Sequence, residues 1–394
     1  MRLYPCKSTK FITKFAKNNN KMTVERDIAG FVIPFAAGAA LLTVLLPIFS
    51  AYQTYTTAGA SAVASICLVL LMHPSHKRMS SNTLWFIIIT LGLCCGIITS
   101  LAGNWHRSLA PDADGPIWNA ALHFGSGMKS TISSIPFADT QSNAVISALI
   151  TGDRSDLEPG LLESFRKSGA SHILALSGMH LGIIYGMLKL ILSLIGNRPG
   201  VKVIKSATIV AACGFYTMSA GAGASLVRAF IFITIAEIAS GCGRSKNLKD
   251  LLLTSLLIQL ALFPHEIKDV GFQLSYAAIA GIAYIYPHLR DLWPQKSENE
   301  GFVLKGLRWI WYSVAISVSC QITTGPIAYA YFGTFPKYFL ITNLMAVPLV
   351  SAIIPFSILT TALTAIGICP SFLVSVTECM VQAMLYCLNV IGSI

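Results

Sequence analysis

Long apolar segments separated by short polar loops recur along almost the whole chain, and they restrict its fold more than any other feature. Hydrophobic residues make up 54% of the sequence and charged residues 11%, whereas soluble domains carry about 25% charged residues. A chain this apolar could not cover its surface with polar groups in water. We therefore expect an all-α polytopic membrane protein, because helices satisfy their own backbone hydrogen bonds in hydrocarbon.

A membrane-spanning helix needs about 20 apolar residues, and this criterion predicts about 11 transmembrane helices. We place them at residues 28–50, 57–73, 83–103, 171–195, 204–222, 225–243, 248–264, 270–289, 309–331, 337–361 and 370–393. Lys and Arg concentrate in alternate loops, as the positive-inside rule requires. This alternation predicts a multi-pass protein of the cell inner (cytoplasmic) membrane, with its N-terminus cytoplasmic and its C-terminus periplasmic or external.

The same pattern divides the chain into four regions. Residues 1–27 form a basic cytoplasmic tail, 28–103 the N-terminal transmembrane helices, 104–144 a short external segment, and 145–394 the main transmembrane domain. Within the external part, residues 116–150 are predicted to be weakly helical and interfacial. One external amphipathic helix is expected just after them, because Pro159 suits a first helical turn and Gly169 suits the position after a last turn.

The predicted span at 171–195 opens with the polar stretch SHILALSGMHLG. On a continuous helix Ala175, Gly178, Gly182 and Gly186 would form a small-residue packing stripe, with Ser177 and His180 on the opposite side. If the chain breaks at Ser177, the stripe fails and the unwound backbone must line water or be covered by protein.

Four interpretations of Ser177 and His180 stay open on this basis. They are interhelical hydrogen bonding, the lining of a polar conduit, a serine hydrolase dyad, and a metal site with His172. The hydrolase lacks the G-x-S-x-G context and a neighbouring acid, and the metal site lacks a third ligand.

Further polar side chains occur inside the apolar segments. Arg228 opens one span and Glu237 lies deeper in it, while Gln273 and Asn343 lie in others. A charge at the bilayer centre costs about 2.5–3.5 kcal/mol, so such residues usually face a cavity or a partner. For Arg228 the alternative is extension to the outer interface, and for Gln273 and Asn343 it is simple packing.

The chain carries no motif for a bound cofactor, a metal or a nucleotide. Its 10 cysteines include no C-x-x-C pair, and most lie in apolar segments, where they are expected to be small buried hydrophobic residues. No phosphate-binding G-x-x-x-x-G-K-[ST] motif occurs. We therefore expect no cofactor and no metal site.

Four segments together resemble the ComEC family of DNA-uptake competence proteins. They are ALITGDRSDLEPGLLESFRKSGASHILALSGMHLG (148–182), VRAF (227–230), DVGFQLSYAAIAGI (269–282) and PIAYAYFGTFPKYFLITNLMAVPLVSAIIPF (326–356). They occur in the family's order and cover most of residues 145–360.

The resemblance implies a non-enzymatic inner-membrane channel that passes single-stranded DNA into the cytoplasm during natural transformation. Together with the polar residues above, it gives a set of expected path-lining positions: Asp153, Arg154, His172, Ser177, His180, Arg228, Glu237, Phe272, Gln273, Ser275, Phe332 and Asn343. The implied partners are single-stranded DNA, the lipid bilayer, a periplasmic DNA receptor and a cytoplasmic ATP-driven DNA motor. A separate nuclease and a homo-oligomer are also compatible with it.

The chain departs from many relatives in two ways. Residues 104–142 are too short for the family's external five-stranded barrel, and no H-x-H-x-D cluster of a metallo-β-lactamase-like domain occurs. We therefore expect no nuclease activity in this polypeptide. A transporter of a smaller anionic solute on the same scaffold, or a truncated non-functional copy, are the alternatives.

Overall fold

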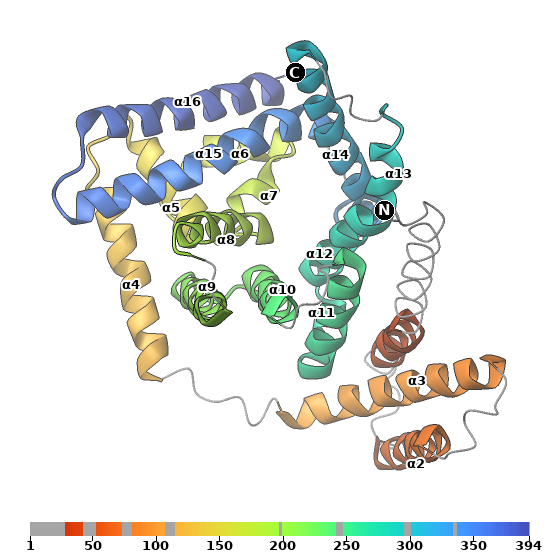
Figure 1. Ribbon diagram of the computed structural model, residues 1–394. Coiled ribbons are helices and arrows are strands. Elements are labelled where there is room, and N and C mark those ends of the chain that lie inside the picture. The colour runs from red at the N-terminus through yellow and green to blue at the C-terminus, as the bar shows by residue number, and fades with distance from the viewer. Residues whose placement is uncertain are drawn as a thin grey trace, which may run out of the picture. The chain divides into compact units, whose positions relative to one another are not determined.

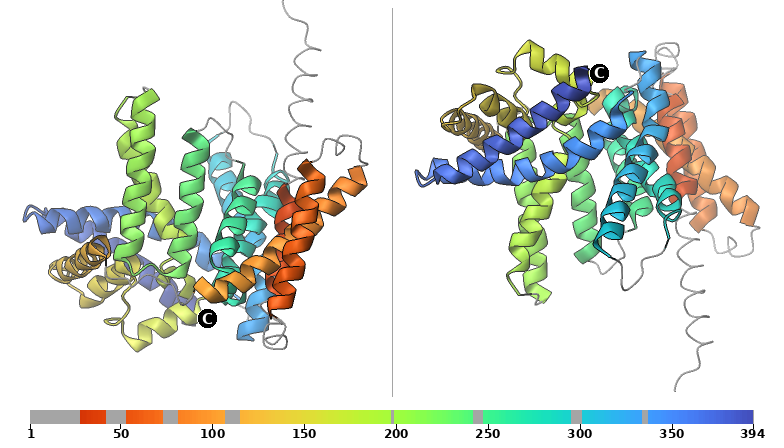
Figure 2. Two further views of the ribbon diagram at one scale, coloured as in Figure 1. Left: turned by 90° about the horizontal axis from the view of Figure 1, so that it is seen from below. Right: turned by 90° about the horizontal axis from the view of Figure 1, so that it is seen from above.

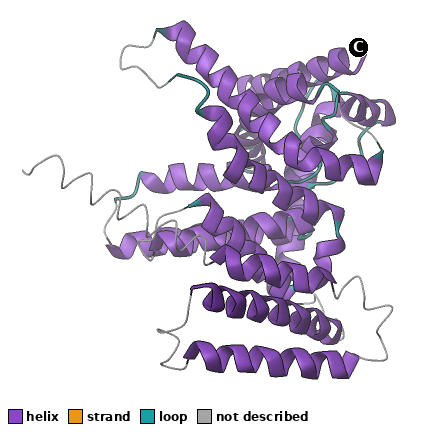
Figure 3. Ribbon diagram, turned by 90° about the vertical axis from the view of Figure 1, so that its right-hand side faces the viewer, coloured by secondary structure: helices purple, strands orange, loops and turns teal. Residues whose placement is uncertain are grey.

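The structure, a computed structural model, describes residues 28–41, 53–72, 81–106, 115–196, 199–241, 247–294, 301–333 and 337–393. Regular structure in these ranges is helical, without a strand (Figure 3), which confirms the all-α prediction for them. Five of the described helices contain stretches long and apolar enough to cross a membrane: Thr83–Ser100, Gly200–Ser219, Ala224–Gly241, Phe339–Ala365 and Ser371–Ser393. The count of eleven spans and the sides of the termini stay predictions.

The chain forms two compact units. The first contains residues 1–111 and 246–270, and the second contains residues 112–245 and 271–394. The first unit includes an apolar helix at Ile28–Leu41, followed by α2 (Gln53–Met72), α3 (Ser81–His106), α11 (Leu248–Leu262) and the short 3₁₀ helix η4 (Pro264–Lys268). Small residues of α2 and α3, including Ala60, Ala64 and Cys94, form its buried core.

The second unit holds the remaining helices (Figure 1). They are α4 (Pro116–Ser133), α5 (Thr140–Thr151), α6 (Pro159–Lys167), α7 (Ser171–Leu174), α8 (Gly178–Ser193), α9 (Pro199–Ser219), α10 (Ala224–Gly241), α12 (Val270–Ala280), the π-helical turn η5 (Gly281–Ile285), α13 (Tyr286–Arg290), α14 (Phe302–Phe332), α15 (Phe339–Ala365) and α16 (Ser371–Ser393). The helix α6 confirms the predicted short amphipathic helix, since Phe165 is buried and Arg166 exposed.

Helix α5 lies at the centre of the larger core of this unit. Every residue from Ala144 to Ile150 is buried, and the surrounding side chains come from α4, α6, α7, α15 and α16. Helix α5 is thus enclosed by protein, and the interfacial position of residues 116–150 stays a prediction. From Ala144 to Ile150 its side chains are small or aliphatic, and a helical segment without a polar face is stable when other helices enclose it.

Helices α8, α9 and α10 pack as a separate three-helix group with its own core, which includes Leu181, Cys213 and Leu226. Helices α15 and α16 lie side by side and run crosswise to this group (Figure 1 and Figure 2). Because the two groups differ in direction, they cannot both cross one planar bilayer along its normal.

Two close contacts join the α8–α10 group to the core around α5. The Tyr216 hydroxyl of α9 donates to the Ile150 carbonyl at the end of α5, at 2.6 Å. Gly125 of α4 lies against the backbone of Ser219, where an added Cβ would overlap the Ser219 carbonyl oxygen. These contacts fix the end of α9 beside the loop that follows α5.

Candidate functional site

Two of the sequence blocks that carry the family resemblance, GDRS and ALSGMH, meet in space although about twenty residues separate them in sequence. The Arg154 Nε donates to the Leu174 carbonyl at 3.1 Å. An ideal Cβ on Gly152 would lie 2.5 Å from Cδ1 of Leu176. The loop after α5 therefore packs directly on the segment between α7 and α8.

Gly152 makes this approach possible by its backbone conformation. It follows the last residue of α5 with φ 82° and ψ 0°, and its N–H donates to the Ala148 carbonyl. A left-handed residue that closes a helix in this way is usually glycine, because a Cβ is strained there. Here a Cβ would also meet the Leu176 side chain.

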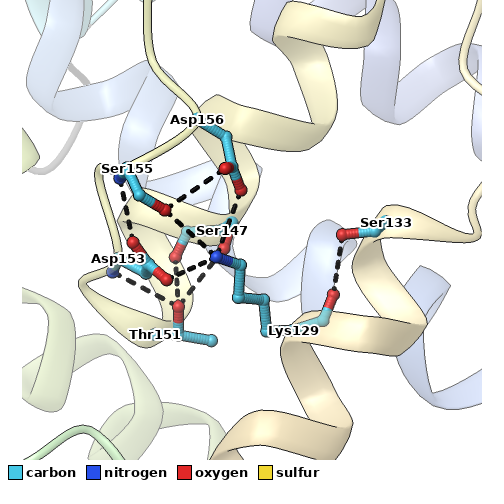
Figure 4. A network of polar contacts seen from close by, with 7 residues as sticks. All are labelled: Lys129, Ser133, Ser147, Thr151, Asp153, Ser155 and Asp156. Atoms are coloured by element: carbon cyan, nitrogen blue, oxygen red, sulfur yellow. Dashed lines mark hydrogen bonds and ion pairs between the residues drawn. The ribbon is translucent and has the colours of Figure 1, made fainter.

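Lys129 of α4 holds the acidic residues of this loop (Figure 4). Its ammonium group lies 2.5 Å from Oδ2 of Asp153 and 3.2 Å from Oδ2 of Asp156, and it donates to the Ser155 hydroxyl at 3.1 Å. Asp153 in turn accepts the Ser155 backbone N–H at 2.9 Å. The Lys129 hydrogen bond lowers the pKa of Asp153 from 3.8 to about 2.

We expect the contribution of the Lys129–Asp153 pair to stability to stay the same across the whole neutral pH range. The folded pKa of Asp153 is depressed, so its contribution is complete above about pH 4 and disappears as the pH falls toward 2. The pKa of Lys129 is raised above 10.5 by the Asp153 hydrogen bond, so the cation persists below that pH. The difference in unfolding temperature between the wild type and Lys129→Met should therefore stay constant from pH 5 to pH 9. A difference that changes within this range would contradict the assignment.

The predicted continuous helix at 171–195 is interrupted. α7 ends at Leu174, Ala175 is extended with ψ 122°, and α8 begins at Gly178. The predicted stripe from Ala175 through Gly186 is therefore wrong at its first position. Gly178 does lie close to another helix, with an ideal Cβ 3.3 Å from the Ala229 Cβ of α10, whereas Gly182 and Gly186 have open space around theirs among the described residues.

Ser177 and His180 cap the start of α8. The Ser177 hydroxyl oxygen accepts the Met179 N–H at 3.3 Å, and His180 Nδ1 accepts the Ser177 N–H at 3.3 Å. This reciprocal arrangement is a capping box, which satisfies backbone donors that a helix start leaves free. Because Nδ1 accepts a hydrogen bond, a neutral His180 carries its proton on Nε2.

The sequence predicted that His180 lines a path, whereas its side chain is completely buried in the structure. Its Nε2 has no hydrogen-bond partner within the described residues. Although Ser177 Oγ lies 3.0 Å from Nδ1, a hydrolase base needs a carboxylate on its second nitrogen. Two glutamates lie within apolar segments, and both bind other residues: Glu237 accepts the Tyr185 hydroxyl, and Glu378 accepts the Asp139 N–H.

Replacing Ser177 with alanine should destabilise α8 by about 1 kcal/mol, because the Met179 N–H loses its acceptor. Ser177→Asp should retain most of the stability, since a carboxylate also accepts at this position. The unfolding temperature of the detergent-solubilised chain measures both effects. Equal losses in the two variants would show that the hydroxyl does not act as a cap.

A second group of predicted site residues surrounds Arg228, which is 7% exposed on α10. Its Nη2 donates to the Ser275 hydroxyl of α12 at 3.1 Å. Also on α12, the Phe272 and Tyr276 rings pack at a tilt of 43° with their centroids 4.6 Å apart, and Gln273 Nε2 donates to the Tyr331 hydroxyl of α14 at 3.1 Å. Arg228 neighbours Ala229, which touches Gly178, so this group adjoins the start of α8.

Glu237 lies elsewhere, inside the α8–α10 group. Its carboxylate accepts the Tyr185 hydroxyl at 2.7 Å and the Ser206 hydroxyl at 2.7 Å, and Lys189 Nζ lies 3.4 Å away. One buried side chain thus joins three helices. We therefore interpret Glu237 as an interhelical tie, that is, a buried side chain whose polar contacts link α10 to α8 and α9.

The remaining predicted residues are more scattered. His172 is exposed, with Nδ1 3.1 Å from the Gly169 carbonyl oxygen. Phe332 is 61% exposed at the end of α14. Asn343 is half-buried on α15, and its Oδ1 has no partner within the described residues. Phe332 directly follows Tyr331, the partner of Gln273, and no hydrogen bond among the described residues joins Asn343 to Arg154 or Arg228.

Sequence reasoning missed Lys129, which supplies the cation of the GDRS loop from a helix 24 residues away. A single lysine in a weakly amphipathic segment carried no signal for this contact. In the parts of the chain that the structure describes, no group of three or more His, Cys, Asp or Glu side chains could hold a metal ion.

These features define a helical membrane-type protein whose polar groups gather around one helix break and one buried arginine. The family model described as "Competence protein" matches residues 149–394. The chain therefore belongs to this competence protein family, which confirms the resemblance drawn from its sequence blocks.

One curated protein gives a shorter match. ComE operon protein 3 of Bacillus subtilis (strain 168) is 28% identical over 137 residues, which correspond to 34% of this chain and 17% of that protein. No solved structure matches the chain.

Proposed function

We propose that the chain forms an inner-membrane channel that passes single-stranded DNA into the cytoplasm during natural transformation. Membership of the competence protein family supports a role in DNA uptake. The relative's name, which refers to a ComE operon, agrees with it.

One observation carries the proposal beyond family membership. The GDRS loop packs on the break before α8, and there Arg154 is exposed and bonded to the Leu174 carbonyl at the end of α7. Single-stranded DNA carries one negative charge per nucleotide, and proteins bind it with cations and aromatic faces. Arg154 and His172 supply exposed donors, and Phe332 supplies an exposed ring, whereas Phe272 is 3% exposed and packs against Tyr276.

The proposed partners follow from this role. Single-stranded DNA would arrive from a periplasmic DNA receptor and be pulled inward by a cytoplasmic ATP-driven motor. The channel itself would act without catalysis, so strand degradation would belong to a separate nuclease.

The test is natural transformation in the native host after deletion of the gene and restoration from a plasmid. Entry of fluorescent DNA into the periplasm and into the cytoplasm is scored separately. We expect the deletion strain to accumulate DNA in the periplasm without cytoplasmic entry, and restoration to reverse this. Normal cytoplasmic entry in the deletion strain would refute the proposal and favour a smaller anionic solute or a redundant copy.

A further inference from the structure

Lys129 directs all of its hydrogen-bonding capacity to one loop. An ammonium group has three donors, and here its three partners are Asp153, Ser155 and Asp156, at 2.5, 3.1 and 3.2 Å. The lysine belongs to α4, whereas its partners follow α5 (Figure 4). The contact therefore joins two elements and is specific to this loop.

The loop places a guanidinium between two carboxylates. Arg154 lies directly after Asp153 and two residues before Asp156. Its Nε donates to the Leu174 carbonyl, and within the described residues its Nη1 and Nη2 atoms form no ion pair with Asp153 or Asp156, which both pair with Lys129. Guanidinium groups bind carboxylates strongly and often with two parallel hydrogen bonds. Something must therefore keep these neighbouring acids away from Arg154.

We propose that Lys129 is a positioning residue that holds Asp153 and Asp156 away from Arg154, so that the outer edge of this guanidinium stays available for a backbone phosphate of single-stranded DNA. This inference rests on the proposed function and adds a residue to it. Arg154 is exposed, and its planar fork matches the geometry of phosphate oxygens. Lys129 itself contributes through the two aspartates and not by touching the strand.

The charges of the loop support this role. Asp153, Arg154 and Asp156 together carry a net charge of −1, which Lys129 brings to 0 (−1 + 1 − 1 + 1). Without Lys129, a DNA strand would approach a negatively charged loop in which Arg154 forms ion pairs with Asp153 and Asp156. With Lys129 both acids are already paired, so the arginine supplies the attractive contact.

The experiment measures binding of a fluorescent 30-nucleotide oligo(dT) to the purified full-length chain in lipid nanodiscs. Four variants are compared with the wild type: Arg154→Met, Lys129→Met, Lys129→Met/Asp153→Asn/Asp156→Asn, and Lys167→Met. Asparagine keeps an oxygen that can accept the Ser155 N–H, so the triple variant removes charge while retaining the turn. Lys167 is an exposed lysine at the end of α6 and controls for a general loss of charge.

We expect Arg154→Met and Lys129→Met each to weaken binding about fivefold at 0.1 M salt and to reduce the salt slope by about 0.7, as for one lost phosphate contact to a single strand. The triple variant should bind within about twofold of the wild type, because no acid competes for Arg154. A triple variant as weak as Lys129→Met, or a Lys129→Met variant no weaker than Lys167→Met, would overturn the inference.

A second readout without DNA separates this inference from the proposed function. Phenylglyoxal modification of Arg154, followed by mass spectrometry, reports whether its guanidinium is available. It should be slower in Lys129→Met and restored in the triple variant. A wild type that does not bind oligo(dT) would refute the proposed function, whereas an Arg154 modification rate unaffected by Lys129→Met would refute the positioning role.

Discussion

Gly125→Ala is expected to destabilise the chain by about 2 kcal/mol, although alanine normally favours a helix over glycine. An ideal Cβ at Gly125 would overlap the Ser219 carbonyl oxygen. That oxygen belongs to the backbone at the end of α9, so it cannot rotate away as a side chain would. Forcing extra volume into a packed contact costs about 1–3 kcal/mol, which outweighs the helix gain of about 0.5–1 kcal/mol.

Gly127 provides the matched control, because it lies two residues away in the same helix and has open space around its Cβ position. Gly127→Ala should leave stability unchanged or raise it by up to about 1 kcal/mol. The measurement is the temperature at which half of the detergent-solubilised full chain is lost from the monodisperse fraction. Opposite shifts in the two variants support the contact between α4 and α9. Equal shifts would show that this contact does not form.

Glu237→Leu should destabilise the α8–α10 group by about 3 kcal/mol. The substitution leaves the Tyr185 and Ser206 hydroxyls without their acceptor and removes the ion-pair partner of Lys189. Unsatisfied buried donors cost about 1–3 kcal/mol each. The Lys189 contribution is smaller, because its side chain is 51% exposed and water screens the pair.

Glu237→Gln should cost only about 1 kcal/mol, since its amide oxygen still accepts one hydroxyl and the Ser206 oxygen can accept from its NH₂ group. Thermal unfolding of both variants measures the difference, and DNA uptake measures whether the carboxylate has a role beyond stability. Uptake lost in Glu237→Gln at normal membrane levels would contradict its assignment as an interhelical tie.

The helical class and several helix positions could be predicted because they depend on local sequence. Apolar length alone indicates α9, α10, α15 and α16. For α6, Pro159 indicates the first turn and the basic residues Arg166 and Lys167 indicate the last turn, and the helix does begin at Pro159. The contact between the GDRS loop and Leu176 could be expected only from family membership, because local sequence patterns do not predict which loops lie together in the folded chain.

Two features depended on tertiary structure and could not be predicted, and for a third, the helix break at Ser177, the sequence left a continuous and a broken helix open. Hydropathy does not distinguish a helix enclosed by protein from one enclosed by lipid, so the burial of α5 was missed. Periodicity predicted one helix through Ser177, whereas the local Ser177–His180 capping box starts a new one. Polar residues inside apolar segments suggested a water-facing wall, yet Arg228 and Glu237 are buried among partners that other helices supply.

The enclosure of α5 also limits how the protein can change shape. The GDRS loop begins at the C-terminal end of a helix whose residues 144–150 are all buried, and moving this helix would disturb the packing of five neighbouring helices at once. Segments with few buried contacts open far more easily than those at the centre of a core. The loop is therefore a fixed reference point, and any gate would have to move less enclosed elements, such as the exposed end of α14 at Phe332.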